Sequence, residues 1–260
     1  MILIFDTYGG LCNQMYDIMN AINFCLKYNI QFTFRYCSFR NDNLNSWTEQ
    51  PFEKLFDSNF YKYKQYIHYD TIKDKLTNDN CYNLNDKRLS NTFLSDILND
   101  LTKIKKEYIV LKQFWSVYKF KNVIDPNVHL HILPSMDIME KYIELKNTLP
   151  EYNFIHYRYE KDFTDHFKIK VPELKHLLQN IKFKQKLKIY VATSNINQFE
   201  LNDIELNDIL HKNDDILENY EQRAFVDYMV GLKSVEAYGH KKSSFSCMIN
   251  NIKSTNNYYA

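Results

Sequence analysis

The residues with the clearest chemical potential lie in the stretch HYRYEKDF, which follows a predicted strand in the second half of the chain. His156, Arg158 and Asp162 come at the end of this strand, where open α/β sheets place ligand-binding residues. A guanidinium is planar, permanently charged and forked, so Arg158 can grip a diphosphate and stabilise charge on a leaving group. The alternative is an ordinary ion pair between Arg158 and Glu160 or Asp162.

A pair of glycines marks a second candidate site. The chain has only four Gly, and Gly9 and Gly10 are adjacent between an apolar run and an amphipathic pattern. Glycine here permits a positive φ, and the following helix start attracts anions, so a phosphate or sugar can approach the backbone. Asn13 adds an amide in the first turn. The alternative is the tight turn that any α/β domain needs after its first strand.

A third group of candidates lies near the C-terminus. Asp227 sits in the helical stretch AFVDYMVGL, where an unpaired carboxylate is costly, so it lies near the end of the apolar face or has a partner. Ser243, Ser244 and Phe245 are predicted to open the last helix. Serines at a helix start are N-caps or phosphate ligands, and the two roles can coexist.

The elements that must position these residues alternate along the chain. Alternating strands and helices predict parallel sheets covered on both faces, beginning with a right-handed βαβ unit. A break near Pro150 divides residues 1–149 from residues 150–260. Between Arg40 and Lys105 only short helices and loops are expected. The predicted strands are 2–5, 31–36, 108–111, 152–157, 187–192 and 235–238, and the predicted helices are 11–28, 135–148, 171–181 and 220–232.

Composition excludes several classes of protein. The 260 residues are 45% hydrophobic, which is enough for a sizeable core. The 33 Lys and Arg nearly balance the 32 Asp and Glu, which gives no reason to expect nucleic acid as a partner. Five scattered Cys argue against a zinc site and a disulfide framework. No stretch has the roughly 20 apolar residues of a membrane span, and the first apolar run is too short for a secretory signal, so a cytoplasmic location is expected.

Four segments, in order, resemble motifs of the GDP-fucose fucosyltransferase superfamily. The nearest branch is that of the protein O-fucosyltransferases, with their plant O-fucosyltransferase and rhamnosyltransferase relatives. YGGLCNQM is similar to the family's Gly-Gly-x-x-Asn-Gln turn, and FIHYRYEKDF to its His-x-Arg-x-x-x-Asp motif. KIYVATSN resembles a strand ending in Val-Ala-Thr-Asp, and FVDYMVGLKSVEAYGHKKSSFS resembles the closing segment. The region 41–150 carries no convincing match.

This resemblance implies an α/β fold of the GT-B-like type, with two Rossmann-like domains whose parallel sheets face a central cleft. Residues 1–149 would form the acceptor side, and residues 150–260 would bind the nucleotide sugar. The implied reaction is an inverting, metal-independent transfer of fucose from GDP-fucose to a glycan or protein hydroxyl, with no cofactor beyond the donor. The chain has no Asp-x-Asp triplet to hold a divalent ion, in keeping with that mechanism.

The family pattern also implies a role for each candidate residue. Arg158 would contact the β-phosphate, and Asp227 would pair with the guanine or the ribose. Ser194 stands where the family often has an acidic residue, which leaves the nucleobase open. The remaining donor-binding residues implied by the pattern are Ser243, Ser244 and Phe245 around the phosphates, Thr193 at the end of its strand, and Asn13 with the Gly9 and Gly10 backbone in the other domain.

The general base has several candidates. His156, Asp162 and Asp17 each carry a suitable group, and Asp162 ranks first because its motif is expected to face the cleft. Two other functions stay open. One is rhamnosyl transfer from a nucleotide-rhamnose, because the RYEKD variant is shared with the plant relatives. The other is a nucleotide-sugar-binding protein without turnover.

Overall fold

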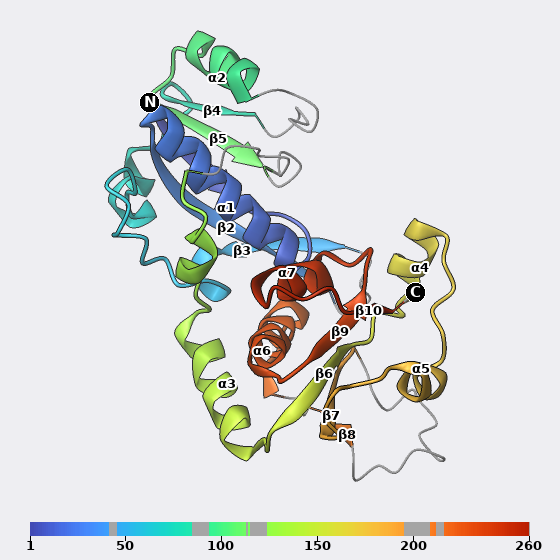
Figure 1. The fold of residues 1–260 in the computed structure, drawn as a ribbon. Coiled ribbons are helices and arrows are strands. Elements are labelled where there is room, and N and C mark those ends of the chain that lie inside the picture. The colour runs from blue at the N-terminus through green and yellow to red at the C-terminus, as the bar shows by residue number, and fades with distance from the viewer. Residues whose placement is uncertain are drawn as a thin grey trace. The chain divides into compact units, whose positions relative to one another are not determined.

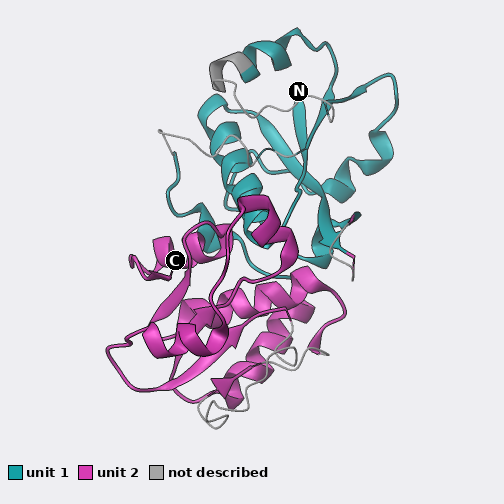
Figure 2. Ribbon diagram, turned by 90° about the vertical axis from the view of Figure 1, so that its right-hand side faces the viewer, with its two compact units in different colours: residues 1–40, 47–135 teal, residues 41–46, 136–260 magenta. Residues whose placement is uncertain are grey.

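The computed structural model describes residues 1–41, 46–84, 94–112, 114, 124–194, 209–211 and 216–259, with the backbone alone at 94–96. The chain forms two compact units (Figure 2). Unit 1 comprises residues 1–40 and 47–135, and unit 2 comprises residues 41–46 and 136–260. Each unit contains one sheet together with its own helices. In the described part of the chain, no helix combines the length and apolar character that crossing a bilayer requires.

The strands described in unit 1 form a sheet in the order β3-β2-β1-β5-β4 (Figure 1). Strand β1 pairs in parallel with both β2 and β5, which confirms the predicted parallel βαβ start. Strands β3 and β4 lie in the region where only short helices and loops were predicted, so that prediction was wrong for these two strands. Strand β3 is also antiparallel to β2, unlike the parallel pairs that the alternation of strands and helices predicts. The elements are β1 (Ile2–Asp6), α1 (Leu11–Tyr28), β2 (Gln31–Arg40), β3 (Trp47–Pro51), β4 (Cys81–Asn83), α2 (Leu94–Lys103) and β5 (Tyr108–Lys112), with short 3₁₀ helices at Phe52–Lys54, Tyr69–Thr71, Lys73–Lys75 and Val128–His131.

Apolar sequence explains the core of unit 1. Strand β1 reads ILIFD, and all five residues are buried, as a central parallel strand covered on both faces requires. Helix α1 buries Met15, Ile18 and Ile22 at helical spacing. Aromatic rings fill much of the remaining space, with Phe5 in contact with Phe114 at 5.3 Å between ring centroids. This packing fixes the carboxyl end of β1, where the glycine turn begins.

Unit 2 has a second sheet in the order β10-β9-β6-β7-β8, and each of its strand pairs is parallel. Its central strand β6 reads YNFIH and is buried throughout. Strand β9 starts at Ala237, two residues later than predicted, and the predicted helix 171–181 forms only as α5. The elements are α3 (Met136–Thr148), β6 (Tyr152–His156), α4 (Lys161–Phe167), α5 (Leu174–Asn180), β7 (Lys188–Ala192), β8 (Ile209–Leu210), α6 (Tyr220–Lys233), β9 (Ala237–His240), α7 (Ser244–Ile252) and β10 (Tyr258–Tyr259).

The division between the units comes earlier in the chain than the predicted boundary near Pro150. Unit 1 ends at Ser135, and α3 belongs to unit 2, where it packs against α6. Ile138 and Tyr142 form the buried face of α3. A helix joins the unit that buries its apolar face, and the proline that follows α3 ends the helix without ending the unit.

The register of unit 2 brings several candidate residues to one edge. His156, the last residue of β6, pairs with Ala192 of β7 and with Gly239 of β9. The chain segments that follow these strands therefore leave the sheet side by side, at the carboxyl edge where α/β folds place ligands.

Candidate functional site

Arg158 lies just beyond the end of β6 and is surrounded by oxygen acceptors. Its Nη2 donates to Asp162 Oδ2 at 2.9 Å, and its Nη1 donates to the Tyr220 hydroxyl at 2.9 Å. Its Nε lies 3.3 Å from Glu160 Oε2. The side chain of Arg158 is 12% exposed, that of Glu160 is 7% exposed and that of Asp162 is 37% exposed. The ion pairs that the sequence offered as the alternative interpretation are therefore present.

The oxygen groups of this cluster stabilise the charged form of Arg158. Burial alone lowers the pKa of the Arg158 guanidinium, but Tyr220, Glu160 and Asp162 outweigh it and hold the pKa above its ordinary value. Arg158 is consequently a fixed cation. Glu160 is the inner partner, because its carboxylate also accepts the N–H of Tyr159 at 3.1 Å. Asp162 is the outer partner, on the more exposed side of the guanidinium.

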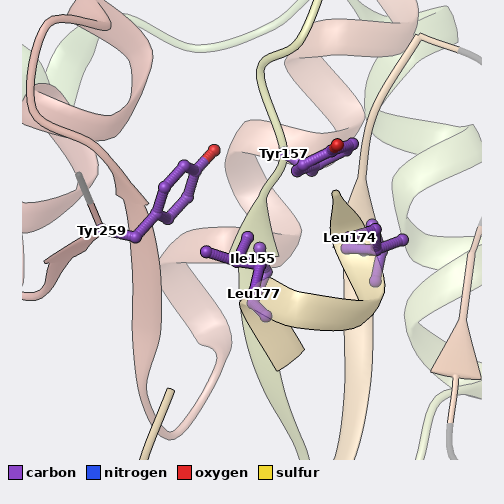
Figure 3. Close-up of a cluster of buried hydrophobic side chains, with 6 residues drawn as sticks. Ile155, Tyr157, Leu174, Leu177 and Tyr259 are labelled. Atoms are coloured by element: carbon purple, nitrogen blue, oxygen red, sulfur yellow. The ribbon is translucent and has the colours of Figure 1, made fainter. Parts of the chain in front are cut away.

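Tyr259, on the last strand, holds the backbone from which Arg158 extends. Its hydroxyl donates to the carbonyl oxygen of His156 at 2.7 Å and accepts the N–H of Arg158 at 3.1 Å. Burial raises the pKa of Tyr259, so the phenol keeps the proton that it donates. Figure 3 shows Tyr259 within the buried cluster around the end of β6, with Ile155, Tyr157, Leu174 and Leu177. Strand β10 therefore fixes the start of the arginine segment.

His156 ties β6 to the start of α7. Its Nδ1 lies 2.8 Å from the Ser246 hydroxyl, and its ring packs on Phe245 at 4.3 Å between centroids. Gly239 makes this approach possible, because a Cβ at that position would lie 2.2 Å from Ser246 Oγ. His156 is 9% exposed, so its observed role is to hold α7 against the sheet.

The first turn of α7 has the predicted position, and of the two roles that the sequence left open for its serines, a side-chain cap is not made. Ser243 is the N-cap residue, and its hydroxyl makes no capping hydrogen bond. The turn also contains no acidic residue that would neutralise the helix dipole. Ser243, Ser244 and Phe245 therefore begin a helix whose positive end is compatible with an anion.

Two further predicted residues lie on neighbouring elements of unit 2. Asp227 of α6 is 6% exposed and accepts the Tyr190 hydroxyl at 2.8 Å, which confirms that it has a partner. Thr193 follows β7 and is 7% exposed. Within the described residues, its hydroxyl is buried and makes no hydrogen bond. Because a buried hydroxyl left unpaired is costly, Thr193 suits a polar ligand atom.

The glycine turn in unit 1 has the predicted geometry. Gly9 has a φ of 94°, a conformation that favours glycine, and Gly10 lies so close to Arg40 that a Cβ would be 2.8 Å from its Nη2. Gln14 is fully buried and donates to the carbonyl oxygens of Gly9 at 2.8 Å and Ser38 at 2.7 Å. Asn13 is half-buried beside Gly9. The turn is therefore rigid, and Gln14 is a structural residue.

The candidates for a general base differ in their surroundings. Asp17 is 1% exposed and accepts the N–H of Tyr8 at 2.8 Å, so its observed role is to stabilise the turn after β1. His156 is committed to Ser246, as described above. Asp162 retains an exposed side but is held by Arg158. Its role as the base stays a prediction.

Several residues of the site were missed by sequence reasoning. Tyr220 begins α6 and bridges Arg158 to Glu160, and its hydroxyl lies 3.3 Å from Glu160 Oε1. Tyr259 lies 101 positions from Arg158, and no sequence pattern connects them. Gly239 did offer a signal, because it is one of only four glycines and it lies four residues before Ser243, the first residue of the predicted phosphate-binding segment.

The described ranges contain no candidate metal site. There, no three His, Cys, Asp or Glu side chains gather in an arrangement that would hold an ion. The cysteines Cys12, Cys25, Cys37, Cys81 and Cys247 all lie in the described ranges and form no disulfide with one another.

Comparison with solved structures places the fold. No protein-family model and no curated protein matches the sequence. The apo form of POFUT1 has a TM-score of 0.66 at 10% identity, covering 100% of this chain and 97% of POFUT1. NodZ alpha-1,6-fucosyltransferase co-crystallized with GDP has a TM-score of 0.59 at 10% identity, covering 95% of this chain and 91% of NodZ. A mutant of Arabidopsis thaliana FUT1 in complex with GDP has a TM-score of 0.56 at 10% identity, covering 96% of this chain and 68% of FUT1.

These similarities confirm the expected GT-B-like α/β fold. NodZ is named as an alpha-1,6-fucosyltransferase, and the fold that the sequence motifs implied agrees with the fold of these three proteins. At 10% identity the agreement concerns the fold, and the chemistry rests on the residues of this chain.

Tyr259→Phe tests the positioning of Arg158. Removing the hydroxyl leaves the His156 carbonyl and the Arg158 N–H without their partner, so we expect a loss of about 1–3 kcal/mol in the free energy of unfolding. We also expect faster amide exchange at Arg158, measured by hydrogen exchange. Tyr258→Phe, on the same strand, is the matched control and should leave this amide unchanged. Equal protection of the Arg158 amide in wild type and Tyr259→Phe would contradict the role.

Proposed function

We propose that this chain is an inverting glycosyltransferase that transfers fucose from GDP-fucose to a glycan or protein hydroxyl without a metal ion. The observation that carries the proposal is the fixed, buried Arg158 at the carboxyl edge of the unit 2 sheet. The fold supports it, because structures of POFUT1 in complex with GDP-fucose and of NodZ soaked with GDP-fucose share this architecture.

In this proposal the donor diphosphate replaces Asp162 on the guanidinium. Asp162 is the outer partner of Arg158 and is 37% exposed, so its carboxylate can turn into water. Glu160, at 7% exposed, stays and keeps the guanidinium oriented. A diphosphate offers more negative charge than one carboxylate, and it gains further charge as the glycosidic bond breaks. Arg158 then stabilises the transition state more than the ground state.

Other groups of unit 2 complete the donor site. The start of α7 at Ser243 and Ser244 supplies backbone N–H groups and the positive end of the helix dipole for the phosphates. Two polar groups are proposed for the nucleoside: the Asp227 carboxylate and the Thr193 hydroxyl, which makes no hydrogen bond to any described residue. A dipole and a fixed guanidinium then neutralise the leaving diphosphate in place of a divalent cation. The contribution of Gly9, Gly10 and Asn13 stays a prediction.

A second candidate function is supported by the ion pairs themselves. With Glu160, Asp162 and Tyr220 around it, Arg158 already has acceptors for its Nε, Nη1 and Nη2 groups. In a protein that binds a nucleotide sugar without turning it over, Arg158 would keep these acceptors and hold the segment after β6 in place. Slow hydrolysis of GDP-fucose, measured by GDP release, separates the two.

Nucleotide preference tests the donor class. A ligand that binds only the folded state raises the melting temperature, so we expect GDP and GDP-fucose to stabilise the protein and UDP and UDP-sugars to leave it unchanged. The measurement is a thermal-shift panel at fixed protein and ligand concentrations. Stabilisation by UDP alone would favour a nucleotide-rhamnose donor. The half-buried Ser194 is compatible with that donor, because it lacks the carboxylate that the family often has at this position.

Substitution of Arg158 tests the catalytic role. Arg158→Lys keeps the charge but loses the forked guanidinium, so we expect its kcat/KM to correspond to a loss of about 3 kcal/mol in transition-state stabilisation. Arg158→Ala should lose more. Because Arg158→Ala removes the cation beside the buried Glu160 carboxylate, the melting temperature of both variants is measured alongside their activity. Arg223→Ala, which removes an arginine bonded to the Leu217 and Glu218 carbonyls of the same unit, is the matched control. Less than about a tenfold loss in Arg158→Lys would exclude the pyrophosphate role.

Chelation tests metal independence. Since a guanidinium and a helix start take the place of a cation, we expect the transfer rate to be the same in excess EDTA and in added manganese. Initial rates with GDP-fucose give the readout. Loss of activity with EDTA and its return with manganese would rule out the metal-free mechanism.

A further inference from the structure

One face of the unit 1 sheet changes character towards the carboxyl ends of its strands. Nearer the amino ends this face belongs to a buried apolar cluster that includes Ile2, Ile4, Tyr108 and Val110. The next residues on the same face of β1 and β5 are Asp6 and Lys112, which are partners in the strand register. Parallel strands covered on both faces are normally apolar throughout, so core packing does not account for these two charges.

A β-bulge in β2 brings an arginine to this polar end. Phe5 pairs with Phe34 in the parallel register. Asp6 pairs with Tyr36, so Arg35 is the extra residue of β2. The Arg35 Nε and Nη2 donate to the two carboxylate oxygens of Asp6 at 3.0 and 2.6 Å. Asp6 is 3% exposed, whereas the Arg35 side chain is 18% exposed, so the bulge neutralises a buried carboxylate and leaves its cation nearer the surface.

Two aromatic rings lie at the same end of the sheet, each in contact with a cation. The rings of Tyr8 and Trp47 are 5.5 Å apart between centroids. The Arg40 guanidinium lies 5.0 Å from the ring centre of Trp47, its partner in the pairing of β2 with β3. The Lys112 ammonium lies 5.0 Å from the ring centre of Tyr8 and forms an ion pair with the exposed Glu49. The polar aromatic face thus comprises Tyr8, Arg35, Arg40, Trp47, Glu49 and Lys112.

The composition of the polar aromatic face suits an uncharged sugar. The cations Arg35, Arg40 and Lys112 are nearly balanced by the carboxylates of Asp6 and Glu49, so the face does not select a strongly charged ligand. It offers both donors and acceptors, and a hydroxyl group can donate and accept. Aromatic rings add apolar area on which the C–H face of a pyranose can pack. A ligand with many hydroxyls and no net charge matches this mixture.

We propose that the polar aromatic face binds an uncharged sugar of a glycan acceptor. The inference rests on the proposed function and selects the glycan over the protein hydroxyl as its second substrate. Open α/β sheets bind ligands at the carboxyl ends of their strands, and in unit 2 that edge is assigned to the donor. The same edge of unit 1 is left for the acceptor. It also adjoins the glycine turn, since a Cβ on Gly10 would lie 2.8 Å from Arg40 Nη2. A sugar bound here lies beside the turn predicted to contact the donor, as transfer requires.

The test measures saccharide binding to the whole chain without any donor. The chain has two tryptophans, so Trp115→Phe leaves Trp47 as the sole tryptophan reporter for fluorescence titrations. The probes are lactose, diacetylchitobiose and cellotriose, with a serine-containing peptide that carries no sugar, and calorimetry on the wild-type chain gives the affinities. The variants are Trp47→Ala, Trp47→Phe and Glu49→Gln. Their controls are Tyr61→Ala, at an aromatic residue that is 68% exposed in the same unit, and Glu53→Gln, at another exposed carboxylate.

We expect a saccharide to shift the Trp47 emission to shorter wavelength, because the bound pyranose excludes water from the indole. Trp47→Ala should weaken saccharide binding by about tenfold or more, and Trp47→Phe should lose less because it keeps a ring. Glu49→Gln keeps the size of the side chain and should also weaken binding, which tests the face independently if Trp47→Ala lowers the melting temperature. Neither control should change the affinity.

Three results would each overturn the inference: binding of the peptide in preference to every saccharide, no binding of any saccharide, or equal losses in the variants and their controls. Failure of the proposed function is read separately, as the absence of GDP release from GDP-fucose. A chain that binds saccharides at Trp47 but releases no GDP would keep the sugar site and lose the proposed transfer.

Discussion

A buried guanidinium at the end of a strand has to be neutralised, and much of unit 2 is arranged to do so. Arg158 is 12% exposed on its side chain, and an isolated charge at that depth is costly. Glu160 lies in its own segment, Asp162 on the following helix, and Tyr220 comes from α6. One arginine therefore fixes how β6, α4 and α6 meet. Removing Glu160, the most buried of its partners, would leave this neutralisation to the more exposed Asp162 and to the Tyr220 hydroxyl.

Strand β10 adds a second constraint on the same arginine. The Tyr259 hydroxyl bonds to the backbone on both sides of Tyr157, at His156 and at Arg158. The last strand thereby holds the arginine segment from the backbone, while the carboxylates hold its side chain. The His156 ring contacts the Ser246 hydroxyl and the Phe245 ring, and these contacts hold the first turn of α7 against β6. Two short elements without charged residues, β10 and the first turn of α7, thus hold the residues on both sides of the proposed phosphate site.

Much of the fold was predictable from the sequence because periodicity reports burial. The apolar runs of β1 and β6 and the pattern of α1 led to the correct elements. The antiparallel edge strand β3 and the placement of α3 in unit 2 were not predicted, since both depend on tertiary pairing. In the site, local chemistry led to Arg158 and Gly9 as candidates and indicated that Asp227 lies near the end of the apolar face or has a partner. Tyr220 and Tyr259 did not, because a contact between residues 62 or 101 positions apart leaves no local pattern.

The ion pairs around Arg158 and its proposed role as a phosphate ligand are compatible, because the two carboxylates differ in accessibility. Glu160 accepts from Tyr159 and lies beside Tyr220, so leaving its place would break several bonds at once. Asp162 is exposed enough to be hydrated, and the energy it loses on leaving is partly returned by water. An incoming diphosphate therefore competes with one carboxylate and is assisted by the other. Such an arginine is oriented before the donor arrives, which reduces the reorganisation needed to stabilise the departing diphosphate.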